Sequence, residues 1–129
     1  MRLLLDSQAF VYIVRQPEAL PVAARSAIED SNNDVFLSIA SPLELQIKIN
    51  TGKITFSRPL RDAVQLELNR GTFAILSITL DHIDSMSRLP SHHRDPFDRL
   101  LVAQAMHEGL TLVTGDRHIR LYPVPCLWD

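Results

Sequence analysis

Cysteine and glycine are scarce in this chain of 129 residues. Its one cysteine, Cys126, excludes an internal disulfide and a zinc site built from several thiolates. Four glycines in all leave little room for a glycine-rich loop that binds phosphate, and no such motif is present. Disulfide-stabilised proteins, thiolate-zinc proteins and P-loop enzymes are therefore poor matches to this composition.

Long apolar runs are also absent. No stretch approaches the roughly 20 apolar residues that cross a bilayer. At the start of the chain Asp6 interrupts the leucine run, which a signal peptide would continue. We therefore expect a soluble, cytoplasmic protein that does not contact a membrane.

A strong net charge is the third absence. The formal net charge is −2, so no global field attracts nucleic acid or an acidic membrane. A polyanion would have to be held by a local cationic patch or by bound cations. Hydrophobic content of 46% with 22% charged residues indicates a folded chain, and we expect residues 1–129 to form one domain.

What is present is a regular alternation of short apolar runs and segments with helical periodicity. The runs indicate strands at residues 3–5, 35–38, 73–76, 110–114 and 124–127. The periodic segments indicate helices at residues 9–14, 21–30, 42–50, 59–70, 80–89 and 96–108. This alternation predicts a three-layer α/β fold with a mainly parallel central sheet.

The most informative stretch lies between His93 and Asp116. Asp95 followed by Pro96 is typical of a helix N-cap with proline at the first helical position. The following helix is apolar on almost every side, which predicts burial, and Gly109 ends it. Two aspartates thus begin a buried helix, and a third follows the next strand.

A second signal is Ser41-Pro42-Leu43-Glu44, which matches the capping-box pattern with proline at the first helical position. On this interpretation Ser41 caps the helix and Glu44 only completes the cap.

Carboxylates gather at the predicted ends of strands and starts of helices. In parallel sheets the carboxyl ends of successive strands meet at one edge, where ligands bind. Taken singly, most of these acids have a structural explanation as caps or turn residues. Taken together they favour one acidic pocket, formed by Asp6, Glu44, Asp95, Asp98 and Asp116.

Converging carboxylates raise one another's pKa unless cations neutralise them. A set of oxygen ligands without cysteine suits Mg²⁺ or Mn²⁺ better than zinc. Such ions bind phosphate oxygens and activate water. The residues alone therefore predict metal-dependent phosphoryl transfer.

Several motifs together resemble the PIN-domain family, specifically its VapC-type toxin ribonucleases, over essentially the whole chain. They are Leu-Leu-Leu-Asp6, Ser41 to Lys48 with Gly52-Lys53, Leu89-Pro90, His93 to Ala105, Leu112 to Asp116, and Tyr122 to Trp128. The resemblance implies a PIN-like fold and an endoribonuclease that leaves 5′-phosphate and 3′-hydroxyl ends. It also implies a cognate antitoxin that blocks the active site, and homodimerisation.

By the same resemblance, the acidic quartet Asp6, Glu44, Asp98 and Asp116 is catalytic and binds Mg²⁺ or Mn²⁺. Asp95 and Thr114 would support it. The sequence departs from the family pattern at Ser7-Gln8, where relatives usually carry Thr-His, and at Pro42. Ser7 keeps the hydroxyl, so these departures bear on substrate contacts and local packing rather than on the acids.

Other side chains have two interpretations. Arg94, Arg99 and Lys48 either contact the RNA backbone or form ordinary surface pairs, and for Lys48 an ion pair with Glu44 four residues earlier is favoured. For the rest we expect packing or surface roles: a surface loop at His92 and His93, an exposed helix turn at His82, and a buried position near the last strand for Cys126. Tyr122 and Trp128 either stack on bases or pack in the core or a dimer interface, and packing is favoured.

Two alternatives remain open. A phosphoryl-accepting receiver or phosphatase would require an acidic pair at the first strand and a lysine after a late strand, whereas Asp6 stands alone and Arg117 follows Asp116. A catalytically silent PIN-like module would bind RNA or protein, and the loss of an acid would indicate it. No acid of the quartet is missing.

Overall fold

The computed structural model describes residues 1–129 and contains one sheet of five strands. All four pairs of neighbouring strands are parallel, so the predicted α/β fold with a mainly parallel sheet is confirmed. In sheet order the strands are β3 (Ala74–Leu76), β2 (Asp34–Ser38), β1 (Arg2–Leu5), β4 (Thr111–Val113) and β5 (Cys126–Leu127).

Strand β1 lies in the middle of the sheet, and its leucines are covered on both faces. Leu3 and Leu5 face one core together with Phe10 and Leu45, and Leu4 faces the other core with Leu101. All three leucines of β1 have no exposed surface. This explains why the strand is a continuous apolar run rather than an alternating one.

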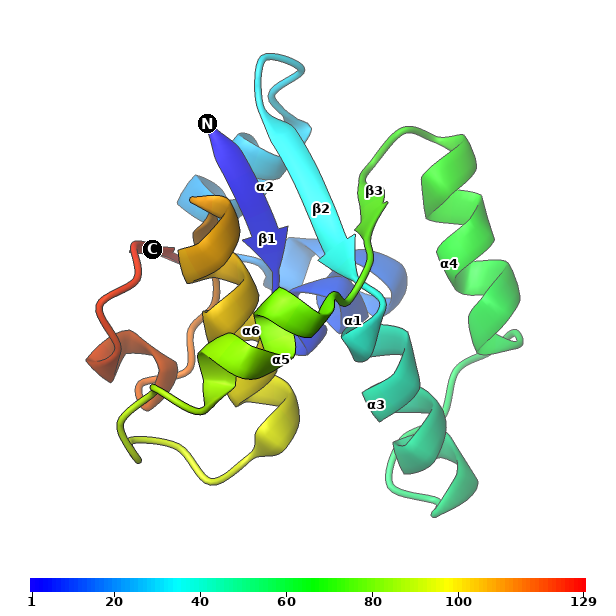
Figure 1. Cartoon of the computed structure of the whole chain (residues 1–129). Coiled ribbons are helices and arrows are strands. Elements are labelled where there is room, and N and C mark those ends of the chain that lie inside the picture. Colours follow the sequence, from blue (N-terminus) through cyan, green and yellow to red (C-terminus); the bar gives the residue numbers. More distant parts are fainter.

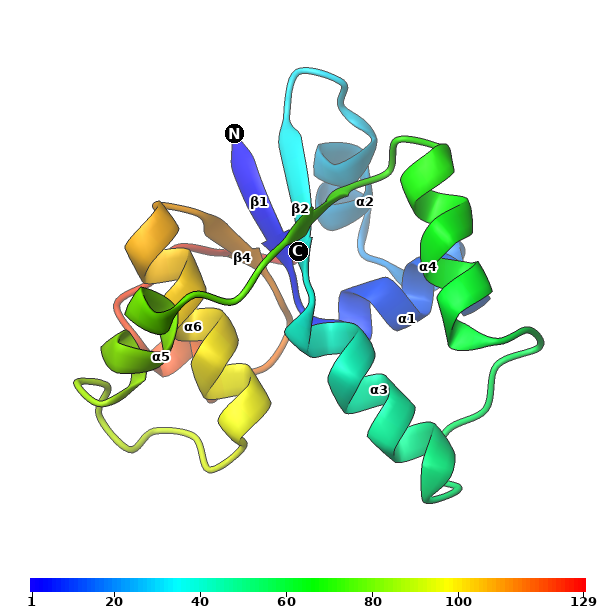
Figure 2. The ribbon, with the colours of Figure 1, turned by 45° about the vertical axis from the view of Figure 1, so that its right-hand side comes forward.

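Helices cover both faces of the sheet (Figures 1 and 2). The first face carries α1 (Ser7–Arg15), α2 (Val22–Glu29), α3 (Ala40–Asn50) and α4 (Leu60–Asn69), and the second carries α5 (Leu80–Met86) and α6 (Pro96–Glu108). Short 3₁₀ helices, η1 (Pro17–Ala19) and η2 (Ile119–Leu121), complete the chain. No helix is both long enough and apolar enough to span a membrane.

The predicted ends of α6 are confirmed. The Asp95 carboxylate accepts hydrogen bonds from the backbone N–H groups of Phe97 (2.8 Å) and Asp98 (3.4 Å). At the other end Gly109 adopts the left-handed conformation with φ of 69°, which glycine adopts without steric cost. The caps fix where the helix begins, and therefore where Asp98 lies in its first turn.

The predicted start of α3 is wrong. The helix begins at Ala40, and no side chain caps it in the way expected of Ser41. Instead, the Ser38 hydroxyl at the end of β2 accepts a hydrogen bond from the Ala40 N–H (3.1 Å). Because the strand leads almost directly into the helix, Ser41 and Glu44 are inside it, and their side chains are buried.

Candidate metal-binding site

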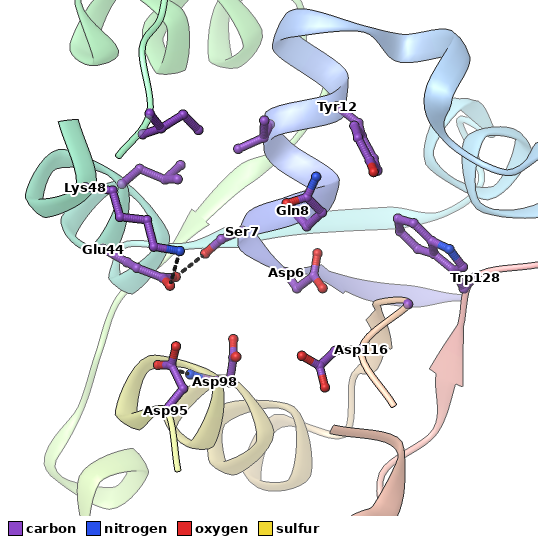
Figure 3. A pocket seen from close by; sticks show the side chains of 14 residues that line it. Asp6, Ser7, Gln8, Tyr12, Glu44, Lys48, Asp95, Asp98, Asp116 and Trp128 are labelled. Carbon is purple, nitrogen blue, oxygen red and sulfur yellow. Dashed lines mark hydrogen bonds and ion pairs between the residues drawn. The ribbon is translucent and has the colours of Figure 1, made fainter. Parts of the chain in front are cut away.

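A pocket of about 480 Å³ lies at the carboxyl edge of the sheet. All four acids of the predicted quartet line it, together with Asp95 (Figure 3). Asp6 and Asp116 follow β1 and β4, Glu44 is in the second turn of α3, and Asp98 is in the first turn of α6. The other lining residues are Ser7, Gln8, Val11, Tyr12, Leu45, Lys48, Ile54, Gly115 and Trp128.

Asp6 follows β1 directly and is 5% exposed. Its Oδ1 accepts a hydrogen bond from the Ala9 N–H (2.7 Å), so it also caps α1. Burial raises the pKa of Asp6 to about 6, although hydrogen bonds from the Thr114 side chain and the Ala9 amide act in the opposite direction. Thr114 follows β4 and is fully buried, and its supporting role in the site stays a prediction.

Glu44 lies on the opposite wall and is held by two partners. The Ser7 hydroxyl donates to Glu44 Oε1 (2.6 Å), and Lys48 Nζ lies 3.1 Å from Glu44 Oε2. The ion pair predicted for Lys48 is therefore present. The hydroxyl of Ser41 lies 3.1 Å from that of Ser7, so the residue predicted as a cap is part of the support of Glu44.

Asp98 is in the first turn of α6 and points into the same pocket (Figure 3). Burial raises its pKa to about 7, and the charges of Asp95, Glu44 and Asp116 add to the increase, while His93 opposes it. A carboxyl group that resists ionisation at neutral pH is one that a bound cation would stabilise in its charged form.

Asp116 follows β4 and is held by backbone amides. Its Oδ1 accepts from the N–H groups of His118 (2.7 Å) and Ile119 (3.1 Å). Partial burial acts to raise its pKa, but these two hydrogen bonds and His93 outweigh burial and leave the pKa below its ordinary value. Asp116 is therefore a turn residue, as one interpretation held, and its lowered pKa keeps its carboxylate ionised at neutral pH.

The oxygen atoms of the quartet are spaced loosely. No three of these four acids bring ligand atoms within 4.8 Å of one another. Protein-bound Mg²⁺ keeps several water ligands and binds only one or two carboxylates directly, so carboxylates that are spaced this far apart fit it. The donor set has no thiolate, and two of its acids have raised pKa values, so its chemistry suits a hard divalent cation.

Aromatic rings form the remaining wall. Trp128 and Tyr12 lie with ring centroids 6.2 Å apart, and both line the pocket (Figure 3). A Cβ at Gly115 would lie 2.7 Å from Trp128 Nε1, so the ring needs glycine at that position. Trp128 is partly buried, whereas Tyr122, 3% exposed, belongs to the core as predicted.

Histidines differ from what the sequence indicated. His93 does lie on a loop, but its Nε2 is 3.0 Å from Asp98 Oδ2 and 3.3 Å from Asp116 Oδ2. His82, expected in an exposed turn, is fully buried. His82 Nε2 lies 2.8 Å from Glu108 Oε1, 26 positions away, and His93 reaches Asp116 across 23 positions. Contacts between residues so far apart in the chain leave no local pattern in the sequence.

Arg99 also differs from expectation. Its guanidinium donates to the backbone carbonyls of Pro90 (3.0 Å) and Met86 (3.2 Å) and to the Tyr122 hydroxyl (3.2 Å). It holds the loop before α6 rather than facing solvent freely. Cys126, expected to be buried, is half-buried, and its thiol pKa is raised by that burial.

Comparison with known proteins identifies the family of this chain. The family model for the PIN domain matches residues 3–124, so the chain belongs to the PIN-domain family. Within the family it is a homologue of the VapC-type ribonucleases. It is 30% identical over 124 residues to Ribonuclease VapC22 of Mycobacterium tuberculosis, covering 95% of this chain and 92% of that protein.

Solved structures show the same fold at lower identity. A chain of VapBC2 from Rickettsia felis, bound to a DNA fragment from its promoter, superposes with a TM-score of 0.74 at 19% identity, covering all of both chains. A chain of DNA-bound VapBC from Salmonella typhimurium superposes with a TM-score of 0.71 at 15% identity, covering 98% of this chain and 97% of that one.

Proposed function

We propose that this protein is a metal-dependent endoribonuclease, the toxin of a toxin–antitoxin pair. One observation carries the proposal: four carboxylates from four separate elements line one pocket at the carboxyl edge of the sheet. Membership of the PIN-domain family and the similarity to Ribonuclease VapC22 support it.

Asp6, Glu44, Asp98 and Asp116 would hold the ion, Mg²⁺ or Mn²⁺. When bound there, a divalent cation supplies positive charge for the phosphate and lowers the pKa of water. The chain's own contribution is orientation. The Ser7 hydroxyl fixes Glu44, and the Ala9 amide fixes Asp6, so two of the acids would be oriented before any ion binds.

The substrate would approach over a cationic rim next to the acids. A second hollow of about 370 Å³ shares Glu44, Lys48 and Asp95 with the first and is also lined by Lys53 and Arg94. Lys53 and Arg94 are exposed and form no ion pair within the chain, so both remain available for phosphates. We propose that Lys48, Lys53 and Arg94 contact the phosphate backbone of the RNA. Arg99 is not included, because its guanidinium is bound to backbone carbonyls of the protein.

A protein partner is the second part of the proposal. An exposed apolar strip runs along α3 at four-residue spacing and consists of Ile39, which precedes the helix, Leu43 and Ile47. It lies beside a hollow of about 380 Å³ between α3 and α4. An apolar strip of this kind suits a protein surface. We propose that a cognate antitoxin and a second copy of the chain use such surfaces, as the VapBC assemblies of the relatives suggest.

Cleavage of RNA by purified, partner-free protein tests the activity. We expect cutting of total or transfer RNA with Mn²⁺ or Mg²⁺, none with EDTA, and none for Asp98→Asn, because that variant removes a metal ligand from the pocket. Asp62→Asn is the matched control: Asp62 is an exposed aspartate in the first turn of α4, and its loss leaves the pocket unchanged.

Two results would contradict the proposal. Full activity in Asp98→Asn would remove this residue from the site. Partner-free protein that neither cuts RNA nor binds Mn²⁺ would overturn the nuclease and favour a silent binding module.

A further inference from the structure

His93 lies outside the acidic quartet yet touches two of its members. We propose that His93 is a positioning residue that holds Asp98 and Asp116 together, so that the two acids form one half of the metal site before the ion binds. The inference rests on the proposed function and adds to it a residue whose task is to arrange ligands.

The two acids come from separate parts of the chain. Asp98 is in the first turn of α6, and Asp116 follows β4. His93 Nε2 donates to Asp116 Oδ2 at 3.3 Å and lies 3.0 Å from Asp98 Oδ2. One ring nitrogen therefore spans the gap between two carboxylates that would otherwise repel each other.

The direction of these contacts follows from the other ring nitrogen. The Asp95 N–H donates to His93 Nδ1 at 3.1 Å, so Nδ1 is the acceptor and Nε2 carries the proton. The neutral ring is therefore already a donor to Asp116, and Asp98 Oδ2 lies beside the same N–H. A ligand-orienting hydrogen bond of this kind does not need a change of charge.

The histidine is fixed from the side of its backbone as well. The His93 N–H donates to the Tyr122 hydroxyl (3.0 Å), and Tyr122 is buried in the core. Arg99 donates to the same hydroxyl and to the carbonyl of Pro90, which ties down the loop that carries His93. A ring held at both ends is suited to orient neighbours and poorly suited to move aside as a gate.

His93 leaves one oxygen of each acid uncontacted. His93 contacts only the Oδ2 atoms, while Asp116 Oδ1 accepts from two backbone amides. Without His93, repulsion would move the two carboxylates apart. Part of the binding free energy of the ion would then be used to bring them together, and the metal affinity would fall. Removal of such an outer contact typically weakens metal binding by about 10-fold to 100-fold.

The test measures Mn²⁺ affinity of the metal-free protein by electron paramagnetic resonance of free Mn²⁺, without RNA. We expect His93→Ala to raise the Kd by about 10-fold or more. His93→Gln keeps an N–H donor near the position of Nε2 and should restore much of the affinity. His92→Ala is the matched control, because His92 is exposed and contacts Tyr122 but no carboxylate.

Thermal unfolding in EDTA accompanies each variant, so that lost affinity is compared with lost stability. Unchanged or tighter Mn²⁺ binding in folded His93→Ala overturns the inference, and tighter binding would indicate a gate. If His93→Ala and His93→Gln lost the same Mn²⁺ affinity at equal stability, the inference would also fail, because the N–H donor at this position would then make no difference. Wild-type protein that binds no Mn²⁺ overturns the proposed function itself, which separates the two failures.

Discussion

Asp6 and Asp98 ionise at a cost, because the pocket removes them from water and places other carboxylates near each of them. Burial, with neighbouring carboxylates, raises their pKa values to about 6 and about 7 from an ordinary 3.8. Between those values and 3.8, the folded protein holds protons that the unfolded chain has lost. Stability therefore falls as the pH rises from about 4 to about 7 in metal-free buffer. The lowered pKa of Asp116 affects stability only below about pH 4, so it does not change the trend between pH 4 and pH 7.

The corresponding prediction concerns Asp98→Asn. At pH 7 without metal, the variant should raise the free energy of unfolding by roughly 2 kcal/mol, because an amide carries no charge to desolvate. At pH 4 the two proteins should be nearly equal, since Asp98 is then protonated in the folded wild type. Urea denaturation at both pH values measures this, with Asp62→Asn as control. A difference of the same size at both pH values would show that the gain is unrelated to ionisation.

At the scale of elements, α5 and α6 are joined by a buried histidine. His82 Nδ1 accepts from the Thr79 N–H (3.1 Å), and its Nε2 lies 2.8 Å from Glu108 Oε1. The first contact completes the capping box of α5, and the second reaches the last turn of α6. Although His82, His107 and Glu108 lie within ligand distance of one another, Nε2 keeps its proton for Glu108, so the group is a structural link rather than a metal site.

This link predicts a large effect for a single histidine. His82→Ala should lower the free energy of unfolding by about 2 to 4 kcal/mol, because it leaves a cavity and removes both hydrogen bonds. Glu108→Gln keeps an acceptor for Nε2 and should cost about 1 kcal/mol or less. Urea denaturation compares the two. If His82→Ala cost no more than Glu108→Gln, α5 would be held by its other contacts alone.

At the scale of the whole molecule, the RNA substrate of the proposed nuclease would meet a protein of net charge −2 whose pocket is acidic. Binding must then depend on the cationic rim of Lys48, Lys53 and Arg94. Anisotropy of a labelled single-stranded RNA in EDTA, across a range of salt concentrations, measures it without cleavage. Arg94→Glu and Lys53→Glu should each weaken binding and reduce the salt slope by about 0.7.

Arg61→Glu is the matched control for the rim, because Arg61 is an exposed cation on α4 outside both hollows that hold the acids. Equal weakening by all three charge reversals would indicate a diffuse response to net charge and would contradict a defined rim.

Local signals in the sequence determined much of the framework. The leucines of β1, the Asp95 cap and Gly109 each act through neighbours in the chain, so the strand, the helix start and the helix end are visible without a structure. The parallel sheet follows from the alternation of elements, and right-handed crossovers place the strand ends that precede Asp6 and Asp116 at one edge. The strand order, and the edge that Asp98 faces, did not follow from the sequence. The site roles of these acids remain predictions.

Only the tertiary structure decided which side chains hold the acids in place. Ser7 reaches Glu44 across 37 positions, His93 reaches Asp116 across 23, and His82 reaches Glu108 across 26. The capping box predicted at Ser41 failed because the helix begins earlier, at Ala40, where the Ser38 hydroxyl accepts from the Ala40 N–H. Ser41 and Glu44 lie inside the helix and contact Ser7 instead. Hydrogen bonds between distant segments depend on packing geometry, which leaves no local pattern in the chain.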